Sequence, residues 1–481
     1  MIKKLLLLTV LLASWVALLW FAIGIDLSKH GNVSLVAIHL LPPLTLWAGW
    51  LGWRAWRERT QAADQAAETE AKQAALETQR AESRASFDKD LAERRTRVDI
   101  RWLQVLDLSK HGEAAHLAGC GEDLQVILLD EEKTETADET SAWPSKQLTE
   151  IFTALTMRCP AALTFPVYVL GPSDRAFAEH ADMVQKARAA AVSTMGSAWP
   201  PEITLGAVLG LQQREASPQE LIDLCATQPE LPGAIVLAFE SPLATQANTK
   251  TPEHEQWFGK AGQALVGMLL TAPILPDVLA KLQEMAPKGA DDVMTPYWDR
   301  TQLASGMMTA LAPLPTDWRQ ALADMPTIAQ LRRPAWVDLA EKARPTQVTQ
   351  NLRRILEQAG VNAALIEPTF AFNGEASKEA PKAPPVQMSD STWLVHNAGS
   401  IDVCGSRIAG IGLALSGAGM DLDVASEGSN VAIHAGDCGC ATPYLMLALA
   451  AAKTAQLQKP ILVTFFQSRH VAMSFVLPTS V

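Results

Sequence analysis

Two long apolar runs open the chain, and a short polar break separates them. The first run spans Leu5 to Ile25, the break Asp26 to Asn32, and the second run Val33 to Trp53. Each run holds about 20 residues, which is the length that crosses the hydrocarbon core of a bilayer. Cations flank the outer ends of the pair, with Lys3 and Lys4 before it and Arg54, Arg57 and Arg59 after it. We therefore expect residues 1–56 to form a two-pass transmembrane hairpin, in contact with lipid through residues 5–25 and 33–53, with both outer ends in the cytoplasm.

A cleaved signal peptide is the alternative interpretation of the first run. Such a peptide has an apolar core of about 7–15 residues and ends at a small-x-small cleavage site. The first run is longer, and the nearest candidate site, Ala22-Ile23-Gly24, directly follows the bulky Phe21. A signal peptide would also leave the second run unexplained, so the hairpin is the preferred interpretation.

Residues 57–97 are rich in Ala, Glu, Gln and Arg and contain neither Gly nor Pro. Helix propensity is therefore high throughout this segment. Large apolar side chains are sparse, with Leu76, Phe87 and Leu91 too few for a strong coiled-coil seam. We predict a solvated helical stalk, about 60 Å long if it is continuous. A stalk that dimerises is the alternative to a lone spacer helix.

From Val98 onward, short apolar runs alternate with amphipathic stretches. Strand patterns occur at Asp99–Leu108, Gln125–Leu129, Pro166–Leu170 and Leu231–Phe239, and helical patterns at Ser145–Cys159, Asp174–Val192 and Pro218–Ala226. This alternation predicts an α/β fold with a mostly parallel sheet that is covered on both faces. Residues 252–360 are mainly helical by pattern. We assign residues 98–372 to one α/β domain.

Residues 373–390 are polar and rich in Pro, which is typical of a flexible linker or insertion. Residues 391–481 then form a second α/β unit in which the same two patterns return. Strand patterns occur at Trp393–Asn397, Gly410–Leu415, Asn430–His434, Pro460–Phe466 and Ala472–Leu477, with an apolar helix at Ala441–Ala455. The two α/β units are either separate or two halves of one sheet system, and a thiolase-like arrangement in two halves is one form of the second interpretation.

The net charge indicates which class of partner is not expected, and the cysteine content indicates the cellular compartment. The net charge is −12 and the pI is near 5.3, and an acidic chain repels nucleic acid, so that partner is not expected. Six cysteines in 481 residues, scattered apart from Cys438 and Cys440, do not form a disulfide framework. This usage is typical of a reducing compartment and agrees with a cytoplasmic soluble region.

The segment Ala435–Thr442, with the sequence AGDCGCAT, carries the most specific candidate chemistry. It places Cys438 and Cys440 just before an apolar helix, where the helix dipole and free N–H groups favour a nucleophilic thiolate. Thiolase-like and ketosynthase enzymes place their nucleophile in such a setting, and His434, His470 or His396 would serve as the base. The alternative is that both cysteines are small residues packed in a tight turn.

Metal and cofactor sites are not expected from the sequence. A single residue between Cys438 and Cys440 is a poor spacing for structural zinc, and no second cysteine pair exists. The glycines at 410, 412, 417 and 419 match neither the dinucleotide fingerprint nor the P-loop. No Gly-x-Ser-x-Gly motif occurs, so the chain gives no sign of being a serine lipase itself.

Several segments in the same order resemble a known family. They are PVYVLGP at 166–172, QPELPGAIVLAF at 228–239, Trp298-Asp299-Arg300, and WLVHNAG at 393–399, after an N-terminal membrane segment. The chain resembles, over about residues 98–481, the type VI lipase adapter family of Gram-negative bacteria. The resemblance implies an inner-membrane protein that binds a phospholipase effector in the cytoplasm and helps load it onto the spike of a type VI secretion machine. It carries over no catalytic residues. A single N-terminal segment would suffice for that role, whereas this chain has a hairpin and a stalk.

Two hypotheses about function follow. The first is a non-enzymatic, membrane-anchored adapter whose interface anchors are drawn from Trp257, Trp298, Trp318 and Trp336, because aromatic side chains dominate binding hot spots. Core packing is the alternative for each of these tryptophans. The second hypothesis is a membrane-anchored enzyme of thiolase-like fold that uses Cys438 or Cys440 with His434.

Overall fold

The computed structural model of the chain divides into two compact units, Met1–Phe87 and Asp88–Val481. The described residues are 2–23, 32–107, 124–128, 137–172, 175–211, 220, 222–223, 228, 230–240, 257–259, 262, 264–284, 306–339, 344–372, 375–376, 383–467 and 470–479. Helix α2 (Asn32–Arg94) crosses the boundary between the units, so the second apolar run and the predicted stalk belong to one continuous helix.

The first unit contains α1 (Ile2–Leu18), the short π-helix η1 (Leu19–Ile23) and most of α2. Pro42 lies inside α2 and has no N–H, so it leaves the carbonyl of Ile38 without its intrahelical donor. The indole Nε1 of Trp15 in α1 donates to that carbonyl at 3.0 Å. The two helices are therefore joined at the position where proline interrupts the helical ladder.

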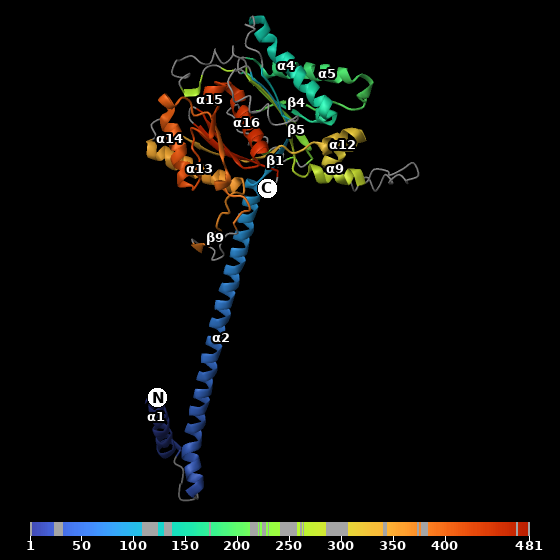
Figure 1. Cartoon of the computed structure of the whole chain (residues 1–481). Coiled ribbons are helices and arrows are strands. Elements are labelled where there is room, and N and C mark those ends of the chain that lie inside the picture. The colour runs from blue at the N-terminus through green and yellow to red at the C-terminus, as the bar shows by residue number, and fades with distance from the viewer. Residues whose placement is uncertain are drawn as a thin grey trace, which may run out of the picture. The chain divides into compact units, whose positions relative to one another are not determined.

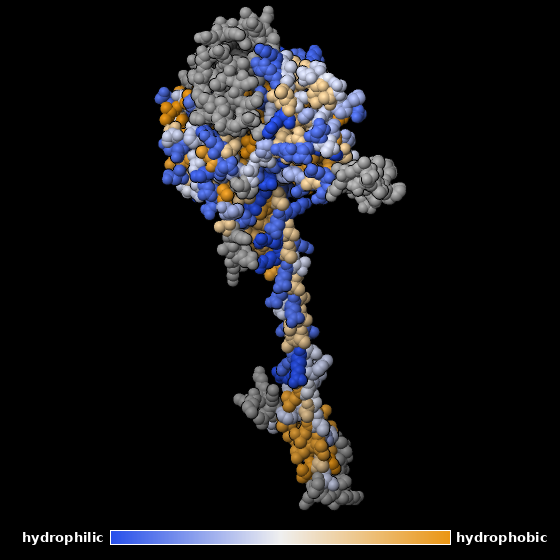
Figure 2. Space-filling view, turned by 45° about the vertical axis from the view of Figure 1, so that its right-hand side comes forward, coloured by the Kyte–Doolittle hydropathy of each residue, from blue (hydrophilic) through white to orange (hydrophobic). Residues whose placement is uncertain are grey.

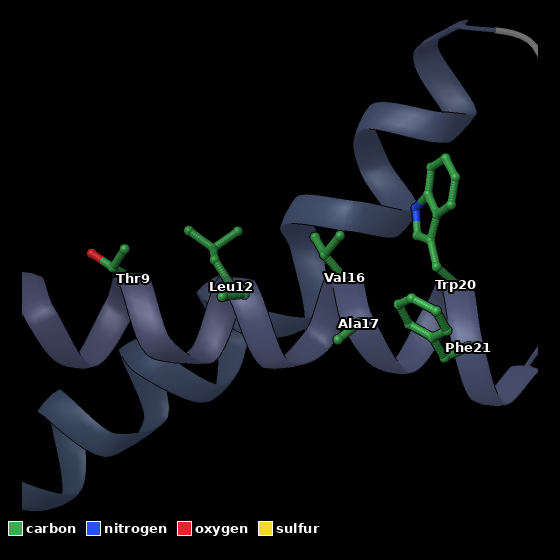
Figure 3. A pocket seen from close by; sticks show the side chains of 7 residues that line it. Thr9, Leu12, Val16, Ala17, Trp20 and Phe21 are labelled. Carbon is green, nitrogen blue, oxygen red and sulfur yellow. The ribbon is translucent and has the colours of Figure 1, made fainter.

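Many of the large apolar side chains described in the first unit are exposed (Figure 2). The exposed ones on α1 and η1 are Val10, Val16, Leu18, Trp20 and Phe21, and those on α2 are Val36, Leu40, Leu41, Leu44, Leu46, Trp53, Trp56 and Leu76. One hollow of about 550 Å³ is lined by Thr9, Leu12, Ala13, Val16, Ala17, Trp20 and Phe21 (Figure 3). Within the described part of the chain, no helix combines the length and the apolar character needed to cross a membrane. The membrane role of residues 5–25 and 33–53 stays a prediction.

The second unit is built on one mixed sheet whose two halves repeat the same order. The first half uses β3 (Val167–Leu170), β4 (Val208–Gly210), β5 (Gly233–Glu240) and β6 (Ala264–Thr271). The second half uses β11 (Trp393–His396), β12 (Gly428–Asn430), β13 (Ile461–Phe466) and β14 (His470–Leu477). In each half the first strand pairs in parallel with the second and third, and the fourth runs antiparallel to the third. The halves meet where β1 (Arg97–Asp107) pairs with β7 (Ala329–Arg332).

The prediction of a mostly parallel sheet was wrong at the centre of the sheet. There β14, β7, β1, β6 and β5 run antiparallel in succession, and only the outer strands and β2 (Leu124–Leu128) pair in parallel. Strand β13 ends at Phe466 and β14 begins at His470, and so short a separation in sequence produces an antiparallel pair. Because β8 (Ala335–Asp338) and β7 both pair with β14, the sheet joins residues on both sides of the predicted linker.

Three apolar clusters show how the layers are stacked. The inner cluster contains α16 (Thr442–Leu457) together with the inward-facing side chains of both halves, such as Val236 of β5 and Val463 of β13. A second cluster packs α4 (Ala137–Arg158) and α5 (Phe177–Met195) on the outer face of the first half. A third packs α13 (Pro345–Asn362) and α14 (Ile401–Gly417) on the outer face of the second half (Figure 1). Helix α16 is thus a central layer between the two halves.

Three sequence-based element assignments were wrong. Gly410–Leu415 lies inside the helix α14, where Gly410 allows close packing, since a Cβ there would lie 3.1 Å from Leu352 of α13. Asn430–His434 is mostly the short helix α15 (Val431–His434). Residues 252–360 include the strand β6, whose apolar residues are buried on both faces and so show no alternation.

Further described helices pack in the outer cluster of the first half. They are α9 (Leu275–Glu284), α11 (Gly306–Leu311) and α12 (Thr316–Asp324). Within the predicted linker 373–390, the structure describes β10 (Glu375–Ala376), which pairs with β9 (Ala371–Phe372), and the 3₁₀ helix η5 (Met388–Asp390). Met388 is buried in the outer cluster of the second half, so the end of this segment packs against the domain.

Candidate functional site

The segment with the two neighbouring cysteines lies at the carboxyl edge of the sheet. It leaves α15, turns at residues 435–438, and enters α16 through the 3₁₀ helix η6 (Gly439–Ala441). Gly436 and Gly439 take positive φ angles of 77° and 52°, which glycine adopts without steric cost. The sequence AGDCGCAT therefore forms the predicted tight turn before a buried helix, and its chemistry depends on what surrounds the two thiols.

Cys438 is sealed within this turn and is 0% exposed. Its Sγ lies 3.6 Å from the carbonyl oxygen of Ala435, within hydrogen-bonding distance. Gly262, just before β6 of the first half, closes the turn from outside, because its backbone N–H donates to the Asp437 carbonyl at 2.9 Å. A Cβ at Gly262 would lie 2.9 Å from the Cys438 sulfur and 2.2 Å from the Ala435 oxygen. A substrate would have to displace this segment to reach Cys438.

Cys440 is half-buried and faces the end of β5. Its backbone N–H donates to Oε2 of Glu240 at 3.3 Å, and its Sγ lies 3.4 Å from the carbonyl oxygen of Phe239. Glu240 is itself buried, and its carboxylate lies so close to Gly439 that a Cβ there would clash with it. The N–H of Cys440 therefore donates to this carboxylate. The sequence-based hypothesis instead requires a free N–H at the start of the helix to stabilise a thiolate.

Tyr444 lies one turn farther along, on the first turn of α16, and is buried. Burial raises the pKa of its hydroxyl, and the acidic groups Glu220 and Cys440 raise it further. The hydroxyl therefore stays protonated at neutral pH. The ionisable groups close to the start of α16 therefore include the carboxyl groups of Glu220 and Glu240.

The three histidines proposed as bases lie in different environments. Burial lowers the pKa of His396 to about 4, and the nearby His434 lowers it further, whereas a hydrogen bond with the backbone of Val424 raises it. Its Nδ1 accepts from the N–H of Ala398 at 3.2 Å, so both ring nitrogens have backbone partners. His470 pairs instead with Asp338 across the β8–β14 ladder. His434 ends the short helix α15 and is half-buried.

The four tryptophans proposed as interface anchors also differ. Trp318 is buried in the first half, with its ring 4.9 Å from that of Trp199, so it is a core residue rather than an anchor. Trp257 is half-buried, and Trp298 lies outside the described residues. Trp336 is 57% exposed and extends from the face of β8 opposite to the buried Val337. It is the most exposed of the described three.

The segment WLVHNAG, which the family resemblance includes, has a structural role. The Asn397 side chain donates from Nδ2 to the Phe466 carbonyl at 2.9 Å and accepts from the Phe466 N–H at 2.7 Å. It therefore extends the pairing of β11 with β13 by one step beyond the end of β11. Trp393 at the start of this strand donates from Nε1 to the hydroxyl of Ser429 at 2.9 Å.

Sequence reasoning missed two residues at this edge, Glu240 and Arg407. Glu240 directly follows the apolar run of β5, and a charge at the carboxyl end of a strand was the available signal. Arg407 is the lone cation in the apolar helix α14, and it lies over aromatic rings. Among the residues that the structure describes, no three His, Cys, Asp or Glu side chains are grouped so that they could hold a metal ion.

No family model matches the chain, and no curated protein is similar to it in sequence. Human mitochondrial 3-ketoacyl-CoA thiolase aligns over 80% of this chain and 99% of its own, at 8% identity and a TM-score of 0.41. OleA of Xanthomonas campestris bound with cerulenin aligns over 79% and 96%, at 10% identity and a TM-score of 0.37. A type II PKS ketosynthase in complex with its acyl-carrier protein aligns over 80% and 99%, at 11% identity and a TM-score of 0.41. Values this low support no inference about activity.

Proposed function

We propose that this protein is a non-enzymatic adapter that binds a phospholipase effector in the cytoplasm and helps load it onto the spike of a type VI secretion machine. The proposal begins from the family resemblance of residues 98–481. The observation that carries its non-enzymatic part is the closed turn around Cys438. Gly262 covers that sulfur, and the Glu240 carboxylate accepts the Cys440 N–H, so the most specific candidate site in the sequence is filled by the protein's own groups.

The first unit would serve as the inner-membrane anchor. Its exposed apolar side chains lie on both α1 and α2, and a lipid environment would remove that surface from water. The aromatic residues Trp53 and Trp56 are followed by Arg57 and Arg59, an arrangement typical of a membrane–water interface. Tethering would raise the local concentration of the adapter near a membrane-bound machine.

Trp336 is the residue that we propose as the central anchor for the effector. An exposed indole supplies a large contact area with few rotatable bonds, which is why tryptophan is enriched at hot spots. The neighbouring ring of His470 lies 6.4 Å away in an edge-on arrangement and helps hold the indole. The surface defined by Trp336, His470 and Asp338 is called the Trp336 surface below.

The test is co-purification of the full-length chain in detergent with a lipase-like effector from cells that express the secretion system. We expect a stoichiometric lipase partner that the double variant Cys438→Ala, Cys440→Ala retains and that Trp336→Ala loses. Leu457→Ala, at another exposed apolar position, is the matched control and should retain it. Loss of the partner in the double cysteine variant, or no lipase partner at all, would contradict the proposal.

The alternative is a membrane-anchored acyl-transfer enzyme of thiolase-like fold. The one observation in its favour is that Cys440, unlike Cys438, is only half-buried at the start of α16. A catalytic Cys440 should react with a thiol reagent at neutral pH within seconds to minutes, and substrate should protect it. Slow labelling of Cys440 in the folded chain, together with fast labelling after denaturation, would exclude this alternative.

A further inference from the structure

Arg407 of α14 lies against three aromatic rings that come from distant parts of the sequence. Its guanidinium carbon is 4.4 Å from the ring centroid of Trp257, 5.3 Å from that of Phe258 and 5.1 Å from that of Phe466. Contacts of this kind hold a guanidinium in place, since the ring faces carry negative electrostatic potential. The cation is therefore positioned by aromatic side chains.

The charge of Arg407 has no carboxylate partner among the described residues. Its Nη1 is buried and lacks a hydrogen-bond acceptor within that part of the chain. Burial lowers the pKa of the guanidinium, while the nearby Cys404 raises it. A buried N–H donor without an acceptor is unfavourable, so the arrangement favours an added acceptor. The structure thus holds a fixed cation beside aromatic rings, with one buried donor that has no acceptor among the described residues.

Three exposed apolar side chains lie on the two helices near this position. Ile401 and Val403 lie on the first turn of α14, and Ile433 lies on α15. The two helices are linked because the Asn430 side chain donates to the Gly399 carbonyl at 2.8 Å. The segment Trp257–Gly259 lies between them, since a Cβ at Gly399 would meet the Trp257 carbonyl and one at Gly259 would meet the Ala432 carbonyl. We define the Arg407 patch as Trp257, Phe258, Ile401, Val403, Arg407 and Ile433.

We propose that the Arg407 patch binds an apolar segment of a partner protein that carries one carboxylate, which pairs with Arg407. Charge complementarity selects this occupant, because a single desolvated cation within an apolar surface matches a single carboxylate. An anionic lipid surface fits less well, since it attracts clusters of several cations and this chain carries net charge −12. The inference rests on the proposed function, because it gives the adapter a second contact with its effector, apart from the Trp336 surface.

The first experiment uses a displayed library of random twelve-residue peptides, selected on the immobilised full-length chain in detergent. We expect the enriched peptides to combine apolar residues with Asp, Glu or a free C-terminal carboxylate. Synthetic versions of the best peptides would then be measured by fluorescence anisotropy. Enrichment of peptides without carboxylates, or no enrichment above a blank surface, would overturn the proposal. Competition by a second copy of the chain would also overturn it, because the patch would then be a self-contact.

Two substitutions test separately what the charge of Arg407 and the apolar side chains of the Arg407 patch contribute to peptide binding. Arg407→Gln should weaken peptide binding by about tenfold to a hundredfold, because it removes a charge-assisted pair. Ile401→Ser should weaken binding by about threefold to tenfold through lost apolar contact. Leu413→Ser is the matched control, because Ile401 and Leu413 lie on the same helix and are each 62% exposed. Thermal unfolding would show whether Arg407→Gln folds. If it does not fold, the loss of peptide binding in Ile401→Ser, compared with Leu413→Ser, still tests the proposal.

The outcome also distinguishes this inference from the proposed function. If the wild-type chain co-purifies with a lipase and Arg407→Gln and Ile401→Ser do so equally well, the adapter role stands and the Arg407 patch is not its contact. If the wild-type chain captures carboxylate-bearing peptides but no lipase, the patch is a binding site and the adapter proposal fails.

Discussion

The two halves of the sheet repeat one order of strands, but their carboxyl edges are completed differently. In the second half, Asn397 bonds both backbone groups of Phe466, and the turn around Cys438 leads into α16. In the first half, β5 ends at Glu240, whose carboxylate reaches across to the N–H of Cys440. The first half thus supplies Glu240 and Gly262 to fill the edge of the second. Glu240 and Gly262 therefore form contacts between the two halves at the edge where a catalytic site was expected.

This difference predicts that the halves unfold as one cooperative unit. Phe239 of the first half and Phe475 of the second are fully buried in opposite outer clusters. Replacing either by Ala should lower the free energy of unfolding by about 3–5 kcal/mol. Chemical denaturation of the full-length chain in detergent should show one transition for the second unit, which moves by similar amounts in both variants.

Phe177→Ala is the control for these two substitutions, because Phe177 is exposed. It should change the free energy of unfolding by less than about 1 kcal/mol. Two separate transitions, with each variant moving only one of them, would show that the halves are independent.

The next largest effect is a pH dependence from His396 at the edge of the second half. Its folded pKa is lowered from 6.5 to about 4, so the folded state excludes the proton that the unfolded state binds. The stability from the neutral ring is therefore complete above pH 6.5 and decreases as the pH falls toward 4, by at most about 3 kcal/mol. The difference in unfolding free energy between wild type and His396→Gln, measured from pH 7 to pH 4, should shrink over this range. A constant difference would contradict the assignment.

A smaller effect is expected where the side chain of Asn397 extends the pairing of β11 and β13. Asn397→Ala leaves one buried N–H and one buried carbonyl of Phe466 without partners, which should cost about 2 kcal/mol of unfolding free energy. Gln283→Ala is the control, because its amide is exposed and donates to Gln320 at 3.3 Å on the surface. Equal unfolding midpoints for the two variants in urea would show that the Asn397 contacts contribute nothing.

The smallest effect on stability should come from Trp336. Because its ring is mostly exposed, Trp336→Ala should change the free energy of unfolding by less than about 1 kcal/mol. Its effect should instead appear in effector binding, with a loss of at least about tenfold in affinity measured by titration of the purified partner. A large loss of stability would identify Trp336 as a packing residue.

The elements of the fold that sequence predicted well are helices with one apolar face and a short apolar run bounded by proline and glycine. The helices at 145–159 and 174–192 correspond to α4 and α5, and the strand at 166–170 to β3. The errors fell where the local pattern fits more than one kind of element. Strand β6 is apolar on both faces, and the helix α14 is rich in Gly, which hides its helical pattern. Strand direction depends on pairing partners that are distant in sequence.

For the candidate site, the sequence predicted the turn and the helix but not what covers them. The turn at 435–441 follows from local glycines, which take positive φ as a tight turn requires. Glu240 and Gly262 approach it from about 200 residues earlier in the chain. The contacts that decide whether a thiol is accessible therefore come from the tertiary structure, and the sequence around the cysteines contains no information about them.

The contact between Trp15 and the Ile38 carbonyl constrains the order in which the N-terminal hairpin can assemble during synthesis. Trp15 leaves the ribosome more than twenty residues before Pro42, so its donor must wait for the acceptor that proline creates. The hydrogen bond that joins the two helices therefore cannot form until the second has emerged. The hairpin is thus completed only when both helices have been made. A nascent chain halted between residues 15 and 38 would lack the hydrogen bond from Trp15 to the Ile38 carbonyl.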